Sequence, residues 1–352
     1  MRARLGIVVI AVAMAIVPTP AAWVERVYST GFYPWFQRVM TPMSNVVPFA
    51  VLDVLIVGGL LAAGTVVIRR HWNEQPRVQG MVRVLVDVSA VVAAVYLVFL
   101  IAWGLNYRRV PLTTQLDFES DRIDPAAVQR LAEEAVRQAN ALHDRATAIG
   151  WPELAALPER LGPAFARVQQ RLPAHGSAMP GIPKPTLLGT YFRRAAVDGM
   201  VDPFFLEVLV NTDVLPFERP FVVAHEWAHL AGFADESEAS FVGWLVCLDG
   251  DVASQYSAWL SLYPTVLRSL PRSNQTAVDA AVAPGPRAHL VLMRERWERS
   301  TPAVRRVGTR VYDGFLRANR VESGVASYDL VVRLMLGTRF VDGWTPAARS
   351  AP

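Results

Sequence analysis

The sequence predicts a mainly helical protein of the α+β class, with N-terminal transmembrane helices followed by a helical domain that holds a small β-sheet. Three patterns support this fold class. Long apolar runs fill the first third of the chain, helical periodicity dominates the rest, and two runs rich in Leu, Val and Phe precede an unusually apolar helix. A hydrophobic content of 52% among 352 residues agrees with membrane segments.

Three apolar segments predict a membrane domain over residues 1–109. The candidate transmembrane helices are 5–24, 49–68 and 84–105, each close to the roughly 20 apolar residues that a bilayer-crossing helix needs. The first segment also fits a cleaved signal peptide, but the apolar segments that follow favour an anchor. Aromatic residues between the first two segments are typical of a membrane interface.

The placement of arginine predicts the orientation in the membrane. Arg2 and Arg4 precede the first segment, and by the positive-inside rule the regions richest in arginine face the cytoplasm. Residues 110–345 would then form the extracytoplasmic part of a multi-pass protein of the cell (inner) membrane, with membrane lipid as a partner. Arg108 and Arg109, which follow the third segment, argue against this orientation. Four arginines that support it lie between the second and third segments: Arg69, Arg70, Arg77 and Arg83.

Residues 110–345 are predicted to form a mostly helical domain. Charged residues become frequent there, and apolar residues recur at helical spacing. Loops are expected at 173–185 and 271–286, and the tail at 346–352 looks disordered. Strands are expected at 186–193 and 204–211, paired by a turn around Asp198 and Gly199. Helices are expected over residues 124–149, 153–172, 250–270, 287–299, 302–319 and 325–336.

The run from Phe221 to Gly232 carries the strongest chemical signal. It reads as a helix because Pro220 precedes it, no breaker interrupts it, and Gly232 can end it. On a helix, His225 and His229 are one turn apart, so both imidazoles leave the same face and can bind one Zn²⁺. Glu226 follows the first histidine and can take a proton from a metal-bound water. The alternative explanation of this motif is a helix with two core histidines and one exposed glutamate that bind no metal.

A third ligand is required, and the segment after Gly232 offers three candidates. Asp235, Glu236 and Glu238 all lie in the first turn of a second predicted helix. Each of them also fits an acid that only favours the positive end of the helix dipole. The residues alone leave the choice among the three open.

The run from Glu236 to Phe241 resembles the Glu-x-x-Ala-Asp signature of the integral-membrane CAAX-prenyl-protease and heat-shock protease group. That resemblance implies that Glu236 is the third zinc ligand. Ser240 stands where the group has an Asp that supports the metal ligands. In zinc peptidases with this motif, an extended substrate adds to the edge strand that precedes the motif helix, and residues 205–211 occupy that place here. An ordinary core strand fits these residues as well, and Glu207 among them could face the cleft as a supporting polar residue.

The whole chain resembles an uncharacterised bacterial membrane family, domain of unknown function 3810. Leu230 and Ser240 depart from the family pattern, where we expect Gln and Asn. Because that family has no established activity, the resemblance implies architecture more than substrate. The matching pieces are the run Trp103–Arg109, Asp202–Phe204, Leu215–Phe217, His225–His229, Gly232–Ala234, the run from Glu236 to Ala239, and Ser327–Tyr328.

Together these patterns predict a zinc-dependent metallohydrolase with a zincin-like, gluzincin-type site and a peptide or protein substrate. Tyr328 is a candidate donor to the oxyanion, although a structural role fits it better. A membrane scaffold with a degenerate site, or an envelope-assembly factor acting on a non-peptide bond, stays open. No basic stripe with interleaved aromatics indicates nucleic-acid binding. Cys247 is the single cysteine and lies in an apolar run, so no disulfide within the chain is possible.

Overall fold

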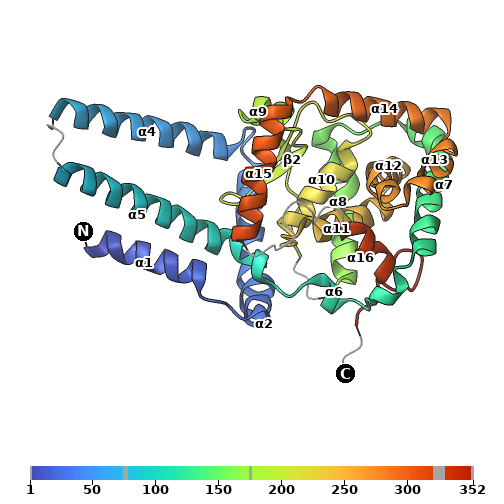
Figure 1. The fold of residues 1–352 in the computed structure, drawn as a ribbon, viewed down its shortest axis with the longest axis horizontal. Coiled ribbons are helices and arrows are strands. Elements are labelled where there is room, and N and C mark those ends of the chain that lie inside the picture. The colour runs from blue at the N-terminus through green and yellow to red at the C-terminus, as the bar shows by residue number, and fades with distance from the viewer. Residues whose placement is uncertain (1, 74–77, 174–176, 320–329, 350–352) are drawn as a thin grey trace.

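Three apolar helices form an arm that projects from a helical body (Figure 1). They are α1 (Arg2–Ile16), α4 (Val51–Asn73) and α5 (Val78–Ala102). The computed structural model describes residues 2–73, 78–173, 177–319 and 330–349. Helices α1 and α5 pack against each other, and all three arm helices expose large apolar side chains. We call these three helices the arm and the remainder the body.

Within the described residues, one helical stretch, Arg83–Ala102, is long and apolar enough to cross a membrane. Helix α1 ends at Ile16 because Pro18 and Pro20 follow, and the chain then bends by 109° into the helical stretch Ala21–Asn45. The predicted transmembrane helix 5–24 is therefore not one straight helix. The apolar part of α4, Val51–Thr65, is shorter than a full span, so three spans remain a prediction.

The base of the arm is built into the core of the body. The helical stretch after the bend consists of α2 (Ala21–Trp23), the π-helix η1 (Val24–Phe32) and α3 (Tyr33–Asn45). Its buried Val24 and Tyr33 share one hydrophobic cluster with Trp103, which follows α5, and with Trp227 in the body. A domain boundary at residue 109 stays a prediction, and close packing crosses it.

Two carboxylates, those of the buried Glu207 and the half-buried Asp53, join α4 to the body. Glu207 Oε2 accepts hydrogen bonds from the backbone nitrogens of Val51 and Leu52, at 2.8 and 3.2 Å, and so caps the start of α4. Its other oxygen pairs at 2.6 Å with Lys184, the only lysine of the chain. Asp53 accepts from the backbone nitrogen of Leu187 at 2.8 Å. Glu207, which could have faced the candidate site, is a structural anchor instead.

The three-stranded sheet has the order β1-β3-β2. Strand β1 (Pro183–Lys184) runs parallel to β3 (Glu207–Val210), and β2 (Gly199–Asp202) runs antiparallel to it. Of the two alternatives for residues 205–211, the structure shows the core strand, because β3 is central and β2 forms the edge beside α10.

Three further segments differ from the expectation. Residues 189–195 form a helix that buries Phe192 and Ala195, three positions apart, so a strand at 186–193 was wrong. Part of the expected loop 271–286 is helical. Residues 346–349 are ordered by antiparallel bridges, Phe340 to Pro346 and Leu116 to Ala348, so the tail is not disordered there.

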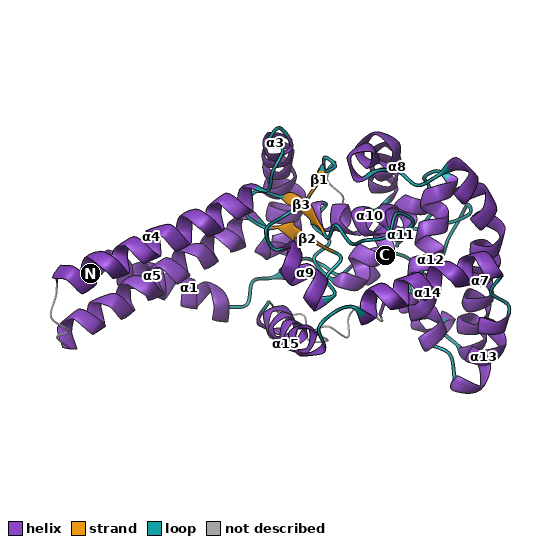
Figure 2. Ribbon diagram, turned by 90° about the horizontal axis from the view of Figure 1, so that it is seen from above, coloured by secondary structure: helices purple, strands orange, loops and turns teal. Residues whose placement is uncertain are grey.

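The body is otherwise helical, and most of the expected helices are present with small shifts at their ends. Helices α7 and α12 pack together, as do α10 and α11, while α15 stands at the base of the arm (Figures 1 and 2). The body helices are η2 (Gly104–Arg108), α6 (Leu112–Gln115), η3 (Ser120–Arg122), α7 (Pro125–Ile149), η4 (Leu154–Ala156), α8 (Leu157–Arg171), α9 (Gly189–Ala195), α10 (Arg219–Leu230), α11 (Glu236–Leu248), α12 (Val252–Arg268), α13 (Arg272–Ala280), α14 (Pro284–Glu298), α15 (Pro302–Ala318) and α16 (Val331–Gly337).

Candidate metal centre

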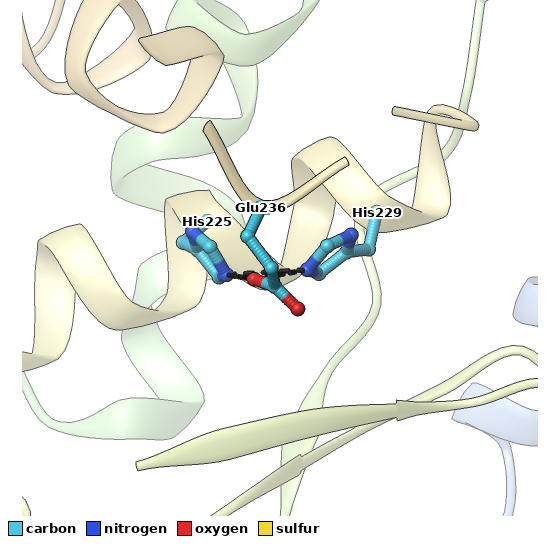
Figure 3. Close-up of side chains that lie close together, drawn as sticks. All are labelled: His225, His229 and Glu236. Carbon is cyan, nitrogen blue, oxygen red and sulfur yellow. Dashed lines mark hydrogen bonds and ion pairs between the residues drawn. The ribbon is translucent and has the colours of Figure 1, made fainter. Parts of the chain in front are cut away.

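Helices α10 and α11 bring His225, His229 and Glu236 to one point. The Nε2 atoms of the two histidines lie 3.2 Å apart. Glu236 Oε2 lies 3.2 Å from His225 Nε2 and 3.4 Å from His229 Nε2. Figure 3 shows the three side chains pointing toward one another. These are the residues that the motif and the resemblance singled out.

The local sequence explains why α11 places Glu236 over the two histidines. Gly232 has a φ of +87°, a backbone conformation that favours glycine, and it turns the chain at the end of α10. Asp235 caps α11 by accepting from the backbone nitrogen of Ser237 at 2.9 Å. A side chain at Gly243 would bring its Cβ within 2.9 Å of the His225 backbone nitrogen. The two helices therefore pack closely only because residue 243 is glycine.

The outer nitrogens of both imidazoles have hydrogen-bond partners. His229 Nδ1 lies 2.7 Å from the Phe233 carbonyl oxygen, which can only accept, so Nδ1 carries the proton. His225 Nδ1 lies 3.2 Å from the Ser240 hydroxyl oxygen. Such outer partners fix the tautomer and orientation of metal-binding histidines. Ser240, a departure from both resembled families, thus occupies the supporting position with a hydroxyl.

The donor set fits a tetrahedral zinc ion. Zinc bonds of 2.0–2.1 Å in a tetrahedron require ligand atoms about 3.3–3.4 Å apart, and the three separations here are 3.2, 3.2 and 3.4 Å. Glu236 Oε2 is buried and makes no hydrogen bond. Two imidazole lone pairs and a carboxylate oxygen at this distance repel one another unless a cation or a proton lies between them.

The charges of the metal-free site follow from this crowding. Burial lowers the pKa of His229, but the adjacent Glu236 carboxylate outweighs burial and raises it to about 9. Burial raises the pKa of Glu236, but the two histidines hold it well below its usual range. A proton therefore sits on His229 at neutral pH when no cation is bound. A metal ion has to displace that proton, which makes binding weaker at low pH.

Glu226 lies beside this centre and has an unpaired oxygen. Burial raises its pKa to about 7, although His225 and His229 oppose that rise. Its Oε2 is buried without a hydrogen-bond partner. A Cβ at Gly199 of strand β2 would lie 2.6 Å from Glu226 Oε1, so only glycine lets the strand pass this close. The Glu226 carboxylate thus lies where α10, the helix that carries both histidines, packs against strand β2 at the edge of the sheet.

The other acidic candidates have different roles. Asp235 is the cap of α11, as described above. Glu238 Oε1 accepts a 2.6 Å hydrogen bond from the Leu112 backbone nitrogen, and burial raises the pKa of Glu238 to about 7. Among the described residues, the group able to hold a metal contains Glu236 and neither of these acids. Tyr328, the predicted oxyanion donor, lies outside the described residues.

Two tyrosines near the centre were missed from the sequence. The Tyr312 hydroxyl donates to Glu236 Oε1, although α15 carries it 76 residues later in the chain. Tyr107 is half-buried nearby, and loss of solvation raises the pKa of its phenol, so it stays neutral. Tyr107 stands in the run that resembles the family, whereas no spacing in the sequence connects Tyr312 with the motif.

Residues at the base of the arm satisfy the end of α10. Trp103 Nε1 donates to the His229 carbonyl at 3.1 Å, and the Tyr33 hydroxyl donates to the Leu230 carbonyl at 2.9 Å. Arg109 donates to the Gly232 carbonyl at 3.0 Å and pairs with Glu25 at 2.7 Å. The last carbonyls of a helix need such partners, and here the base of the arm supplies them.

Comparisons with known proteins identify a family and no function. No curated protein matches the chain, and no solved structure matches it. A model described as "Protein of unknown function (DUF3810)" matches residues 28–336, which include most of the arm base and the whole candidate centre. The chain therefore belongs to this family of proteins of unknown function, DUF3810.

Proposed function

We propose that the protein is a membrane-anchored, zinc-dependent metallohydrolase that cleaves peptide bonds. One observation carries the proposal: His225 Nε2, His229 Nε2 and the unbonded Glu236 Oε2 lie at tetrahedral ligand spacing beside the unpaired carboxylate of Glu226. Three protein ligands leave a fourth position for water or substrate, as catalytic zinc sites do.

The residues of the chain divide the chemistry between them. When bound, zinc supplies Lewis acidity, which activates water and polarises a carbonyl group. Glu226 accepts the proton of the attacking water and then donates it to the leaving amine. Tyr312 holds the second oxygen of Glu236 and so keeps the first directed at the histidines.

The edge of the sheet favours a peptide over other substrates. Strand β2 is the outer strand beside α10, and its Gly199 touches Glu226. The half-buried residues Gly199–Val201 offer an open strand edge to which an extended peptide can add by backbone hydrogen bonds. A peptide bound there would pass directly over the general base.

The surface of the arm supports membrane anchoring. Val91 and Leu85 on α5 are 63% and 67% exposed, and Leu60 on α4 is 69% exposed. Such an apolar surface is unfavourable in water and favourable in hydrocarbon. The arginines near residue 69 and residue 2 support a cytoplasmic tip of the arm and an extracytoplasmic body.

Zinc content and a single carboxylate substitution test the proposal. The full chain, purified in detergent without chelator, should hold about one zinc per molecule, as catalytic sites do. Glu226→Gln should keep that zinc and lose about 10²–10⁴-fold in hydrolysis of a synthetic peptide library read by mass spectrometry. If Glu226→Gln were as active as the wild type, Glu226 would not be the general base. If the wild type held no zinc, the whole proposal of a zinc-dependent hydrolase would fail. Zinc with an inert library would leave a metal site and exclude these peptide substrates.

A further inference from the structure

Helix α15 presents two different exposed rows of side chains. Val307, Val311 and Phe315 follow one another at intervals of four residues, so they form one row along the helix. Their exposed fractions are 59%, 68% and 36%. The neighbouring row, on the side away from the body, carries Arg306, Arg310 and Arg317, all exposed. A row of solvent-exposed apolar side chains beside exposed arginines is unusual for a helix in water.

The apolar row faces the arm. Phe315 makes edge contacts with Phe99 of α5 and with Tyr107, with ring centroids 5.8 Å apart in both cases. Because Val311 and Val307 share the row of Phe315, they extend the same side of α15. In Figure 1, α15 runs across the direction of the arm helices at the base of the arm instead of along it. The exposed apolar surface of the arm thus continues onto α15.

The stretch Ala21–Asn45 repeats this arrangement on the other side of the arm base. It leaves α1 at 109°, and Figure 2 shows α3 and α15 on opposite sides of the sheet. Trp23, Val27, Trp35 and Val39 lie at multiples of four residues, and each is at least 40% exposed. Tryptophan in such a position is typical of the bilayer interface. Two helices crossing the arm therefore expose apolar rows at the same level.

We propose that α15 lies in the surface layer of a bilayer that contains anionic lipid, with Val307, Val311 and Phe315 in the acyl boundary. A helix perpendicular to membrane-crossing helices, at the end of their apolar surface, lies in the plane of the interface. α15 holds four arginines and one acidic residue, Asp313, and arginine pairs well with lipid phosphate. This inference rests on the proposed anchoring of the arm and is independent of zinc and of peptidase activity.

The opposite face of α15 gives this contact a consequence for the candidate centre. Tyr312 lies on the inner face and donates to Glu236 Oε1. One helix therefore touches both the lipid surface and the carboxylate that completes the donor set. The bilayer becomes part of what holds Glu236 in place, and a substrate reaches the centre at the level of the membrane surface.

Site-specific lipid quenching tests the position of α15. Cys247 is fully buried, so a thiol-reactive fluorophore on an added surface cysteine reports one site. Val307→Cys and Val311→Cys are made in the full chain, which is placed in nanodiscs of phosphatidylcholine and phosphatidylglycerol. A fraction of the lipid carries a nitroxide near the top of the acyl chain. The matched control is Val291→Cys on α14, a 48% exposed valine away from the arm base.

Both α15 positions should be quenched at least twofold more than position 291, and replacing phosphatidylglycerol by phosphatidylcholine should reduce that difference. Quenching equal to the control at both positions would overturn the proposal. Strong quenching that is the same with and without phosphatidylglycerol would show that the arginines do not bind anionic lipid preferentially. Zinc content, measured on the same samples, separates failure of this inference from failure of the metal site.

Discussion

Two pairs of histidines lie close together in the described part of the chain, and their surroundings differ. His225 and His229 have ring centroids 4.7 Å apart, and His143 and His289 have theirs 5.2 Å apart. Glu236 enters between the first two nitrogens. In the second pair, the carboxylate that contacts a ring belongs to the exposed Asp144, 2.7 Å from His143 Nδ1, while His289 Nδ1 bonds the Tyr256 hydroxyl at 2.7 Å and its ring stacks on Phe217.

The pKa values of His229 and His289 are consequently shifted in opposite directions. The carboxylate beside His229 raises the pKa of that imidazole to about 9, whereas burial and the charge of His143 lower the pKa of His289 to about 4. The carboxylate of Glu236 therefore attracts a cation to the first pair, whereas His289 stays neutral near pH 7. The difference shows that the inserted acid, and not the proximity of two imidazoles, makes a candidate metal centre.

The largest effect should come from Glu236→Gln, which removes the inserted charge and keeps the shape. Zinc affinity should fall by more than the about 100-fold that loss of an outer hydrogen-bond partner costs. Titration against a competing chelator measures it. His289→Gln is the matched control in the other pair and should bind zinc like the wild type. If Glu236→Gln bound zinc as tightly as the wild type, the inserted carboxylate would not be what distinguishes the two histidine pairs.

Ser240→Ala should have a smaller effect on the same measurement. It removes the partner of His225 Nδ1, and such partners are worth about 10-fold or more in metal affinity. Ser237→Ala is the control, because the Ser237 hydroxyl bonds only Asp235 among the contacts described. If both serine variants bind zinc equally, the hydroxyl of Ser240 does not orient the histidine.

Glu238→Gln tests whether Glu238, the other buried acid at the start of α11, has a role different from that of Glu236. The folded pKa of about 7 exceeds the ordinary value of 4.5, so folding favours the protonated acid. Stability from this group is complete below pH 4.5 and is lost as the pH rises through 7. The neutral variant should therefore melt higher than the wild type at pH 8, with little difference at pH 4.5, and should retain zinc. A lower melting temperature at pH 8 would contradict this.

His289→Gln should show the smallest effect, again through pH. The folded pKa of His289 lies below its ordinary value of 6.5, so its contribution is present above pH 6.5 and is lost as the pH falls through about 4. With chelator present, the wild type should lose more thermal stability than the variant between pH 7.5 and pH 5. Parallel curves would show that the imidazole is not kept neutral by folding.

The sequence predicted the parts of the centre that are close together in the chain. Helical spacing placed His225 and His229 on one face, and the resemblance to zinc proteases selected Glu236 from three acids. Tyr312 could not be found, because its contact depends on where α15 packs and no local period encodes that. The same limit explains β3, whose residues suit an edge or a central strand equally until the position of β1 is known.

The bonds from the arm base to α10 bear on any regulated release of the body by proteolysis. Tyr33, Trp103 and Arg109 all precede residue 110, and they hold the carbonyls of His229, Leu230 and Gly232. A protease cutting the bond after Arg109 would free the chain between the arm and the body. If the arm base then left, the end of the motif helix would lose three donors at once. On the proposed function, shedding would therefore disturb the candidate metal centre and lower the activity of the released body.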